Sequence, residues 1–260
     1  IKGQRSQHRL LLSASASLPL VYLTGSNQAS PMTAPNFCML LRKHIANGKI
    51  VRIWQPGLER IIRLEIEHYN ELGDLCRKDL IVELMGKHSN LIFCAEDGTI
   101  IDSIKHISAQ TSSVREVLPG RPYFIPQTQE KLDPLSTGEE AFSQMVFSKP
   151  MPLSKAIYPS LTGISPVIAE ELCYRASLES GQSANSLDDL SREHLYHTFS
   201  RLAEDVRAGS YEPCIILGEN GEPVEFSSVP LTMYFDLQTK KEASISSVLE
   251  QYYAMKNTVT

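Results

Sequence analysis

Apolar and polar residues alternate along much of the chain from residue 1 to 121, a pattern typical of β-strands with one buried face. Ile62, Leu64 and Ile66 share one face, and the charged residues between them share a face that we expect to be exposed to solvent. Similar runs occupy 50–54, 80–84, 91–95 and 99–104. Asp97-Gly98 lies between the last two runs and predicts a tight hairpin, because its turn needs a positive φ. The pattern predicts a meandering antiparallel sheet or sandwich.

One segment of this first half has helical periodicity instead. Its apolar stripe consists of Phe37, Leu40, Leu41 and Ile45. Asn36 is placed to cap the N-terminus and Gly48 to end the helix, so we expect a helix over about 37–46. Positive charge suits the C-terminal end of a helix dipole, and the last turns hold Arg42, Lys43 and His44.

Repeated prolines and few apolar repeats mark a change of character after residue 118. We expect 122–150 to be a Pro-rich linker between a β-rich lobe, 1–121, and a helical lobe, 151–260. In the helical lobe, a helix from 153 to 160, a turn with Gly163 and a second helix are typical of a helix-hairpin-helix element. Ser165 is the expected N-cap of that second helix, with Pro166 at its first position.

The rest of the helical lobe mixes helices with one hairpin. An amphipathic helix is predicted over about 187–208, ended by Gly209. Asn220-Gly221 then predicts a second tight hairpin, and a last helix begins near Ile245. The predicted fold class is therefore α+β, with a sandwich-like antiparallel lobe followed by a helical lobe.

Composition and charge narrow the class of protein. The chain has 260 residues, of which 42% are hydrophobic, enough for a sizeable core, and no run reaches the ~18 apolar residues of a membrane span. Its five cysteines show no C-x-x-C spacing, which favours reduced thiols over disulfides or zinc. Residues 1–121 hold 15 basic and 11 acidic residues, whereas 122–260 hold 10 and 19. A polyanion partner would therefore face the first half.

Three polar motifs stand at the ends of predicted elements. They are Phe37-Cys38-Met39-Leu40-Leu41-Arg42-Lys43-His44, Gly57-Leu58-Glu59-Arg60 and Glu83-Leu84-Met85-Gly86-Lys87-His88-Ser89-Asn90. Taken singly, each is compatible with solvated charges, a polar turn or dipole-favoured helix ends. In combination they resemble the NFACT family, whose members include bacterial RqcH, also called fibronectin-binding protein A, and eukaryotic NEMF.

This resemblance implies a set of tRNA-binding residues. Glu59 and Arg60 stand where the family has an Asp-Arg pair needed for tRNA engagement, so Glu59 departs from the family by one methylene. Lys87 replaces the usual Arg, which keeps a phosphate contact but loses the planar fork. The other residues that the resemblance places against RNA are His88, Arg42 and Lys43. Lys105, Arg115 and Arg121 extend the same basic half.

The resemblance also implies a fold, a role and a set of partners. The fold would resemble the amino-terminal region of formamidopyrimidine-DNA glycosylases, followed by helix-hairpin-helix. The role would be to bind tRNA and the large ribosomal subunit carrying stalled peptidyl-tRNA, and to recruit alanyl-tRNA for C-terminal alanine tailing. Family members continue with a coiled coil, expected here from Ile245, and a further domain. The protein would be cytoplasmic and ribosome-associated, with surface display reported for some homologues.

Other function classes remain open at this stage. No Walker loop, nucleophile elbow or zinc-ligand cluster is visible, so we expect no catalytic residue, metal or cofactor. A DNA-glycosylase-like enzyme is the weakest alternative for that reason. A surface adhesin that binds fibronectin or fibrinogen is the other alternative, because some family members are described in that way.

Overall fold

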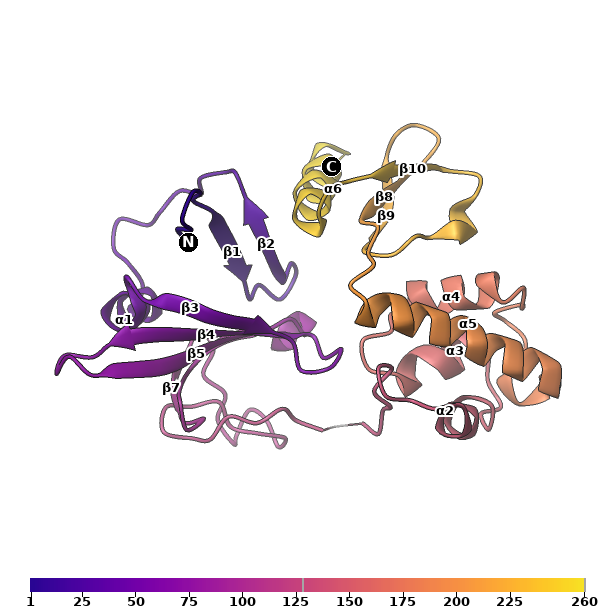
Figure 1. The fold of residues 1–260 in the computed structure, drawn as a ribbon, viewed down its shortest axis with the longest axis horizontal. Helices are drawn as coiled ribbons and strands as arrows, with labels where there is room; N and C mark the ends of the chain where they lie inside the picture. The colour runs from indigo at the N-terminus through magenta and orange to yellow at the C-terminus, as the bar shows by residue number, and fades with distance from the viewer. Residues whose placement is uncertain (128, 260) are drawn as a thin grey trace. The chain divides into compact units, whose positions relative to one another are not determined.

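The computed structural model describes residues 1–127 and 129–259, without the side chain of residue 259. It divides into two compact units, Ile1–Thr128 and Gln129–Thr260, which are described separately below (Figure 1). In the described residues, no helix is both long enough and apolar enough to cross a membrane.

A five-stranded antiparallel meander is the centre of the first unit (Figure 1). Its strands, in spatial as well as chain order, are β3 (Lys49–Trp54), β4 (Ile61–Tyr69), β5 (Leu75–Glu83), β6 (Asn90–Ala95) and β7 (Ile100–Ser103). The predicted Asp97-Gly98 hairpin joins the last two strands. Gly98 has φ 86°, and the Thr99 amide donates to Asp97 Oδ1 at 2.9 Å. The alternation in the sequence therefore predicted the antiparallel meander, and the Asp-Gly pair predicted the hairpin between β6 and β7.

One face of the sheet is covered by a hairpin and a helix. The hairpin consists of β1 (Arg9–Ser13) and β2 (Leu20–Thr24), and the helix is α1 (Asn36–Ile45). The apolar residues of α1 pack with those of the hairpin onto the sheet residues Leu64, Ile66, Leu80, Val82, Leu91 and Phe93. This second layer is thus half hairpin and half helix.

The opposite face, expected to be exposed, is partly covered. Ile61, Ile81 and Ile92 form a second core there with Val117, which comes from the segment after β7. The charged row also differs from the expectation, because Arg63 and Asp79 form an ion pair at 2.5 Å with both side chains largely buried. Alternation identifies the two faces of a strand, but it does not show that a distant loop returns over the polar one.

The ends of α1 differ in detail from the prediction. Asn36 is the first helical residue rather than the N-cap, because Pro35 precedes it and its carbonyl accepts from the Met39 amide at 3.0 Å. Asn47, with φ 62°, takes the left-handed position that ends the helix. Gly48 is needed for space, since a Cβ there would lie 2.9 Å from Ile66 Cγ2.

The second unit begins with four helices: α2 (Glu139–Val146), α3 (Leu153–Ile157), α4 (Pro166–Arg175) and α5 (Asp189–Arg207). Their core includes Phe142, Val146, Leu172, Leu195 and Phe199. α2 lies inside the segment 122–150 that was expected to be a linker. Its Phe142 and Val146 are fully buried, so this part of the segment belongs to the core, and the prolines misled the prediction.

The α3–α4 connection has the predicted turn chemistry. Gly163 has φ 79°, Ser165 Oγ accepts from the Ile168 amide at 3.2 Å, and Pro166 is the first helical residue. The short 3₁₀ segments Tyr158–Ser160 and Ala184–Ser186 complete this region. Two helices and a glycine turn are present, but the assignment as a helix-hairpin-helix stays a prediction.

A small sheet and a last helix complete the second unit. The sheet has the order β10-β8-β9, formed by β8 (Cys214–Leu217), β9 (Pro223–Ser227) and β10 (Gln238–Lys241). Gly221, with φ 78°, lies in the predicted hairpin. The sequence did not predict β10, because all four of its residues are polar and exposed. Helix α6 (Ile245–Val259) packs on the sheet through Val248 and Tyr252, beside Ile215.

Candidate nucleic-acid interface

Two of the three sequence motifs come together at one end of the five-stranded sheet. The connection between β3 and β4 contains Glu59 and Arg60, and the connection between β5 and β6 contains Lys87 and His88. Ile61 pairs with Glu83 across β4 and β5, and the Leu84 amide donates to the Arg60 carbonyl at 2.9 Å. The two turns are therefore neighbours at the same sheet end, which we call the turn end.

The first turn is ordered by its own backbone. Gly57 has φ 55°, a left-handed conformation that other residues adopt only with strain. The Glu59 amide donates to the Pro56 carbonyl at 3.1 Å, and Gln55 Nε2 donates to the Glu59 carbonyl at 2.7 Å. Glu59 is half-buried, whereas Arg60 is exposed. The turn thus presents the guanidinium to solvent.

The second turn is a single turn of 3₁₀ helix, Gly86–His88. Gly86 has φ 55°, and the Met85 amide donates to Ser89 Oγ at 2.9 Å across the turn. Lys87 and His88 are exposed, whereas Ser89 is fully buried. The motif therefore separates into two exposed cationic or titratable groups and a buried serine that holds them in place.

The two exposed cations of the turn end stand apart from the ion pairs of the first unit. Among the described residues, neither Arg60 nor Lys87 forms an ion pair with a carboxylate. By contrast, Arg115 pairs with Glu83, and Arg121 pairs with Glu116 at 2.8 Å. Of the basic residues of this half, Arg60 and Lys87 are therefore better placed than Arg115 and Arg121 to meet a phosphate.

Glu83, the first residue of the third motif, is completely buried and anchors the turn end through its carboxylate. Its carboxylate accepts hydrogen bonds from Arg115 Nη2 and, at 2.9 Å, from the Tyr123 hydroxyl. Arg115 also donates to the Phe124 carbonyl at 2.7 Å. Burial, together with the negative charge of Glu83, raises the pKa of Tyr123. This network fixes the segment 115–124 to the end of β5.

A ladder of cations and aromatic rings extends from this anchor across the partly covered face of the sheet, the face of Ile61 and Ile81. Arg63 Cζ lies 5.2 Å from the ring centre of Trp54 and 5.5 Å from that of Tyr123. Arg52 Cζ lies 4.4 Å from the ring centre of Trp54, and Arg115 Cζ lies 5.6 Å from that of Tyr123. Contacts of this kind contribute roughly 0.5–1 kcal/mol each at exposed sites and more when buried. They stiffen the ends of β3 and β4 next to the first turn.

Asn90, the last residue of the third motif, is structural. Its Oδ1 accepts from the Lys105 amide at 3.0 Å, and its Nδ2 donates to the Lys105 carbonyl at 2.9 Å. Glu83, Ser89, Asn90 and the ladder were not singled out as anchors by sequence reasoning. The available signal was weak: polar residues within an otherwise apolar strand pattern, which must find partners when buried.

Arg42 and Lys43 lie at the other end of the sheet. Lys43 forms an ion pair with Glu71, in the β4–β5 turn, at 3.6 Å with both side chains exposed. β4 is nine residues long, and at about 3.3 Å per residue the two sheet ends are separated by about 26 Å. The six predicted RNA-contacting residues therefore form two groups, with Glu59, Arg60, Lys87 and His88 at the turn end.

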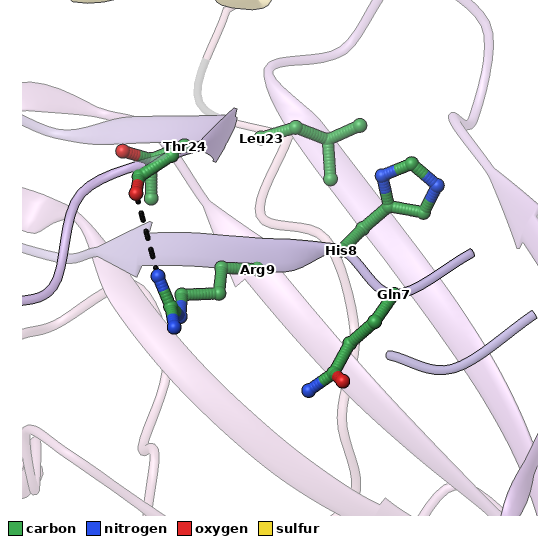
Figure 2. A pocket seen from close by; sticks show the side chains of 6 residues that line it. Gln7, His8, Arg9, Leu23 and Thr24 are labelled. Carbon is green, nitrogen blue, oxygen red and sulfur yellow. Dashed lines mark hydrogen bonds between the residues drawn. The ribbon is translucent and has the colours of Figure 1, made fainter.

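The hairpin β1–β2 carries a hollow that the sequence did not indicate (Figure 2). It measures about 550 Å³ and is lined by Gln7, His8, Arg9, Leu23, Thr24 and Gly25. Arg9 Nη1 donates to the Gly25 carbonyl at 3.3 Å, so its guanidinium lies along the strand ends. The hollow adds a further basic group to the first unit.

Comparison with known proteins identifies the family to which the chain belongs. The family described as NFACT N-terminal and middle domains matches residues 1–259. The chain belongs to this family. A protein of Bacillus subtilis (strain 168) named Rqc2 homolog RqcH is 41% identical over 179 residues, which are 68% of this chain and 31% of that protein. This NFACT chain spans about a third of the length of the curated relatives it matches.

Solved structures agree with the family assignment. The fibrinogen binding protein from Staphylococcus aureus is similar with a TM-score of 0.77 and 27% identity, covering 97% of this chain and 85% of that one. The N-terminal part of the fibronectin/fibrinogen-binding protein from Streptococcus suis is similar with a TM-score of 0.71 and 28% identity, covering the same shares. The mixed fold with antiparallel sheets is therefore that of NFACT amino-terminal regions, and the relatives' names carry no enzymatic activity. The likeness to DNA glycosylases stays a prediction.

Proposed function

We propose that this NFACT chain binds tRNA through the turn end, as part of ribosome quality control. One observation supports this most strongly: Glu83 and the adjacent backbone pairing hold two cationic turns side by side, with Arg60 and Lys87 exposed and unpaired among the described residues. Arginine and lysine presented in this way can contact phosphates or stack on a base. The name of the 41% identical relative, Rqc2 homolog RqcH, agrees with this role.

In this proposal, the protein supplies position and the ribosome supplies chemistry. The chain binds a large ribosomal subunit that carries stalled peptidyl-tRNA and presents alanyl-tRNA there for C-terminal alanine tailing. Arg60 is the main contact, Lys87 neutralises a phosphate, and His88 lies beside it. Glu59 keeps a half-buried side chain with a carboxylate at the first turn, where hydrogen bonds to Gln55 and Pro56 hold its backbone. Such a protein acts in the cytoplasm, on ribosomes.

The test is binding of labelled tRNA-Ala at two salt concentrations. Arg60→Ala combined with Lys87→Ala is expected to weaken binding by roughly tenfold or more. The magnitude of the negative slope of log affinity against log salt should fall by about 1.4–1.8. The matched control is Lys131→Ala with Lys155→Ala, which removes two exposed lysines from the other unit. Equal loss in both variants would mean a general charge effect, and no loss in either would contradict the proposed site.

A second candidate function follows from the names of the similar structures, which describe fibrinogen and fibronectin binding. The variant with Arg60→Ala and Lys87→Ala separates the tRNA-binding function from this second one. An adhesin contact would be measured by immobilised fibronectin or fibrinogen binding to the wild-type chain, and tRNA would not compete with it.

A further inference from the structure

A second hollow lies at the end of the five-stranded sheet opposite the turn end. It measures about 530 Å³ and is formed where the last turn of α1 approaches the β4–β5 connection. We call it the histidine–lysine hollow; it is lined by Lys43, His44, His68, Tyr69, Asn70, Glu71, Leu72, Cys76 and Lys78. Four of these nine residues are basic and one is acidic.

Lys78 lacks the partner that a half-buried ammonium normally has. Its Nζ lies 3.2 Å from His68 Nε2, and in the described part of the chain it forms no ion pair with a carboxylate. His68 is buried, and its Nδ1 lies 3.3 Å from the Tyr69 carbonyl. Because a carbonyl only accepts, Nδ1 is the donor in that contact, and Nε2 faces the Lys78 ammonium. An imidazole ring carries no negative charge, so this contact does not balance the positive charge of Lys78.

His44 faces the same space from α1. Its ring packs on Phe93, with centroids 5.8 Å apart, and lies edge-on to His68 at 6.3 Å. Burial lowers the pKa of His44, and the positive charges of Lys78, Lys43 and His68 lower it further, against a small opposing effect of Glu71. The one carboxylate of the hollow lies on an exposed turn and already pairs with Lys43.

We propose that the histidine–lysine hollow binds a backbone phosphate of RNA, as a second contact about 26 Å from the turn end. Lys78 and Lys43 would donate hydrogen bonds to the phosphate oxygens. His44 would take up a proton from solvent as the anion approaches and become a further donor. A metal ion fits less well, because the Lys78 ammonium lies against His68 Nε2 and repels a cation. This inference rests on the proposed RNA-binding function and adds a second site to it.

The first measurement is the NMR titration of the histidine rings, of which the chain has seven. In the free protein, His44 is expected to titrate below 6.5. Adding tRNA should raise that midpoint, because an anion stabilises the imidazolium, while His194 and His197 in the other unit should not change. Inorganic phosphate, titrated separately, should reproduce the shift only weakly. A shift as large with phosphate as with tRNA would make the hollow a free-phosphate site and overturn the RNA contact.

The second measurement is tRNA affinity against salt for Lys43→Gln and Lys78→Met. Each is expected to weaken binding by roughly three- to tenfold and to reduce the salt slope by about 0.7–0.9. Lys43 is exposed, so its variant tests the contact without affecting folding. Lys49→Gln is the matched control, because Lys49 is exposed at the same end of the sheet but does not line the hollow.

These outcomes separate the inference from the proposed function. If Arg60→Ala with Lys87→Ala weakens binding but Lys43→Gln and Lys78→Met do not, the hollow is not a contact and the turn end stands. If neither set changes the affinity, both are overturned. If Lys49→Gln weakens binding as much as Lys43→Gln, the effect is general electrostatics and the inference is overturned.

Discussion

Two buried glutamates, one in each unit, organise the loops beside them in nearly the same way. Glu83 is 0% exposed and accepts from Arg115 and the Tyr123 hydroxyl. Glu171 is 1% exposed and accepts from Arg175 Nε at 2.6 Å, from Thr232 Oγ1 at 2.8 Å and from the Met233 amide at 2.8 Å. In both, a carboxylate compensated by an arginine fixes a chain segment that is distant in sequence.

The groups that the two anchored regions expose are different. At the turn end, Arg60 and Lys87 stand free of carboxylates within the described residues. Beside Glu171, the 3₁₀ segment Thr232–Tyr234 leads to Phe235, which is 78% exposed and stacks on Tyr174 with ring centroids 6.2 Å apart. The charge follows the same division, since 1–121 is net positive and 122–260 strongly negative. Similar anchors thus support a cationic surface in one unit and an aromatic, acidic one in the other.

The largest effect is expected from Glu83→Ala. It leaves the mostly buried Arg115 guanidinium and the Tyr123 hydroxyl without their acceptor, which should cost the first unit about 3 kcal/mol. Chemical denaturation followed by tryptophan fluorescence measures this, because the only tryptophan, Trp54, lies in that unit. tRNA affinity should fall as well, since both turns loosen. An unchanged fluorescence midpoint would show that the network is not an anchor.

Glu171→Ala should produce a similar but smaller loss, of about 2 kcal/mol, because Arg175 is more exposed than Arg115 and water can solvate it. Circular dichroism of the helices should report this loss while Trp54 fluorescence stays unchanged. The comparison of the two units predicts that the Glu171→Ala variant keeps its tRNA affinity. Loss of tRNA binding in this variant would place part of the RNA contact on the second unit.

Gly86→Ala and Gly221→Ala form a matched pair of turn substitutions. Both glycines have positive φ, 55° and 78°, and a Cβ at either would meet open space. Backbone strain alone should therefore cost about 1 kcal/mol in each case. Only Gly86→Ala is expected to reduce tRNA affinity, because it distorts the turn that carries Lys87. Equal affinities of the two variants would argue against a role for that turn.

The smallest effect concerns alkaline pH. Burial and the charge of Glu83 raise the pKa of Tyr123 above its usual 10.0. The unfolded chain then releases this proton at lower pH than the folded one. The contribution of Tyr123 to stability is therefore complete below pH 10 and declines as pH rises above it. Tyr123→Phe should reduce that decline, which is measured by unfolding followed through Trp54 fluorescence.

The sequence predicted regular elements well and buried polar partners poorly. Periodicity located the meander and α5, because a strand or helix with one apolar face is encoded locally. Asp97-Gly98 and Asn220-Gly221 located the two hairpins, because their turns need positive φ. The pairing of Glu83 with Arg115, 32 residues later, is a long-range contact without a local pattern. Strand β10 was missed because it is wholly polar, and α2 because prolines flank it.

For the site, spacing placed Arg60 and Lys87 in turns but did not reveal that these turns adjoin. The two turns adjoin because of the register of β4 against β5, in which Ile61 pairs with Glu83. The same register separates Lys43 from them by the length of a strand. The resemblance to NFACT proteins named the residues, and the structure divides them between two sheet ends.

Hydrogen exchange of the chain with and without tRNA-Ala tests the central claim most directly. The account predicts slower exchange in the peptides that contain 55–60 and 84–88, because bound RNA covers the two turns and restricts their opening. Peptides around 162–165 and 232–236 in the second unit should exchange at unchanged rates. Protection confined to those second-unit peptides, with the two turns unaffected, would contradict the assignment of the RNA-binding surface to the turn end.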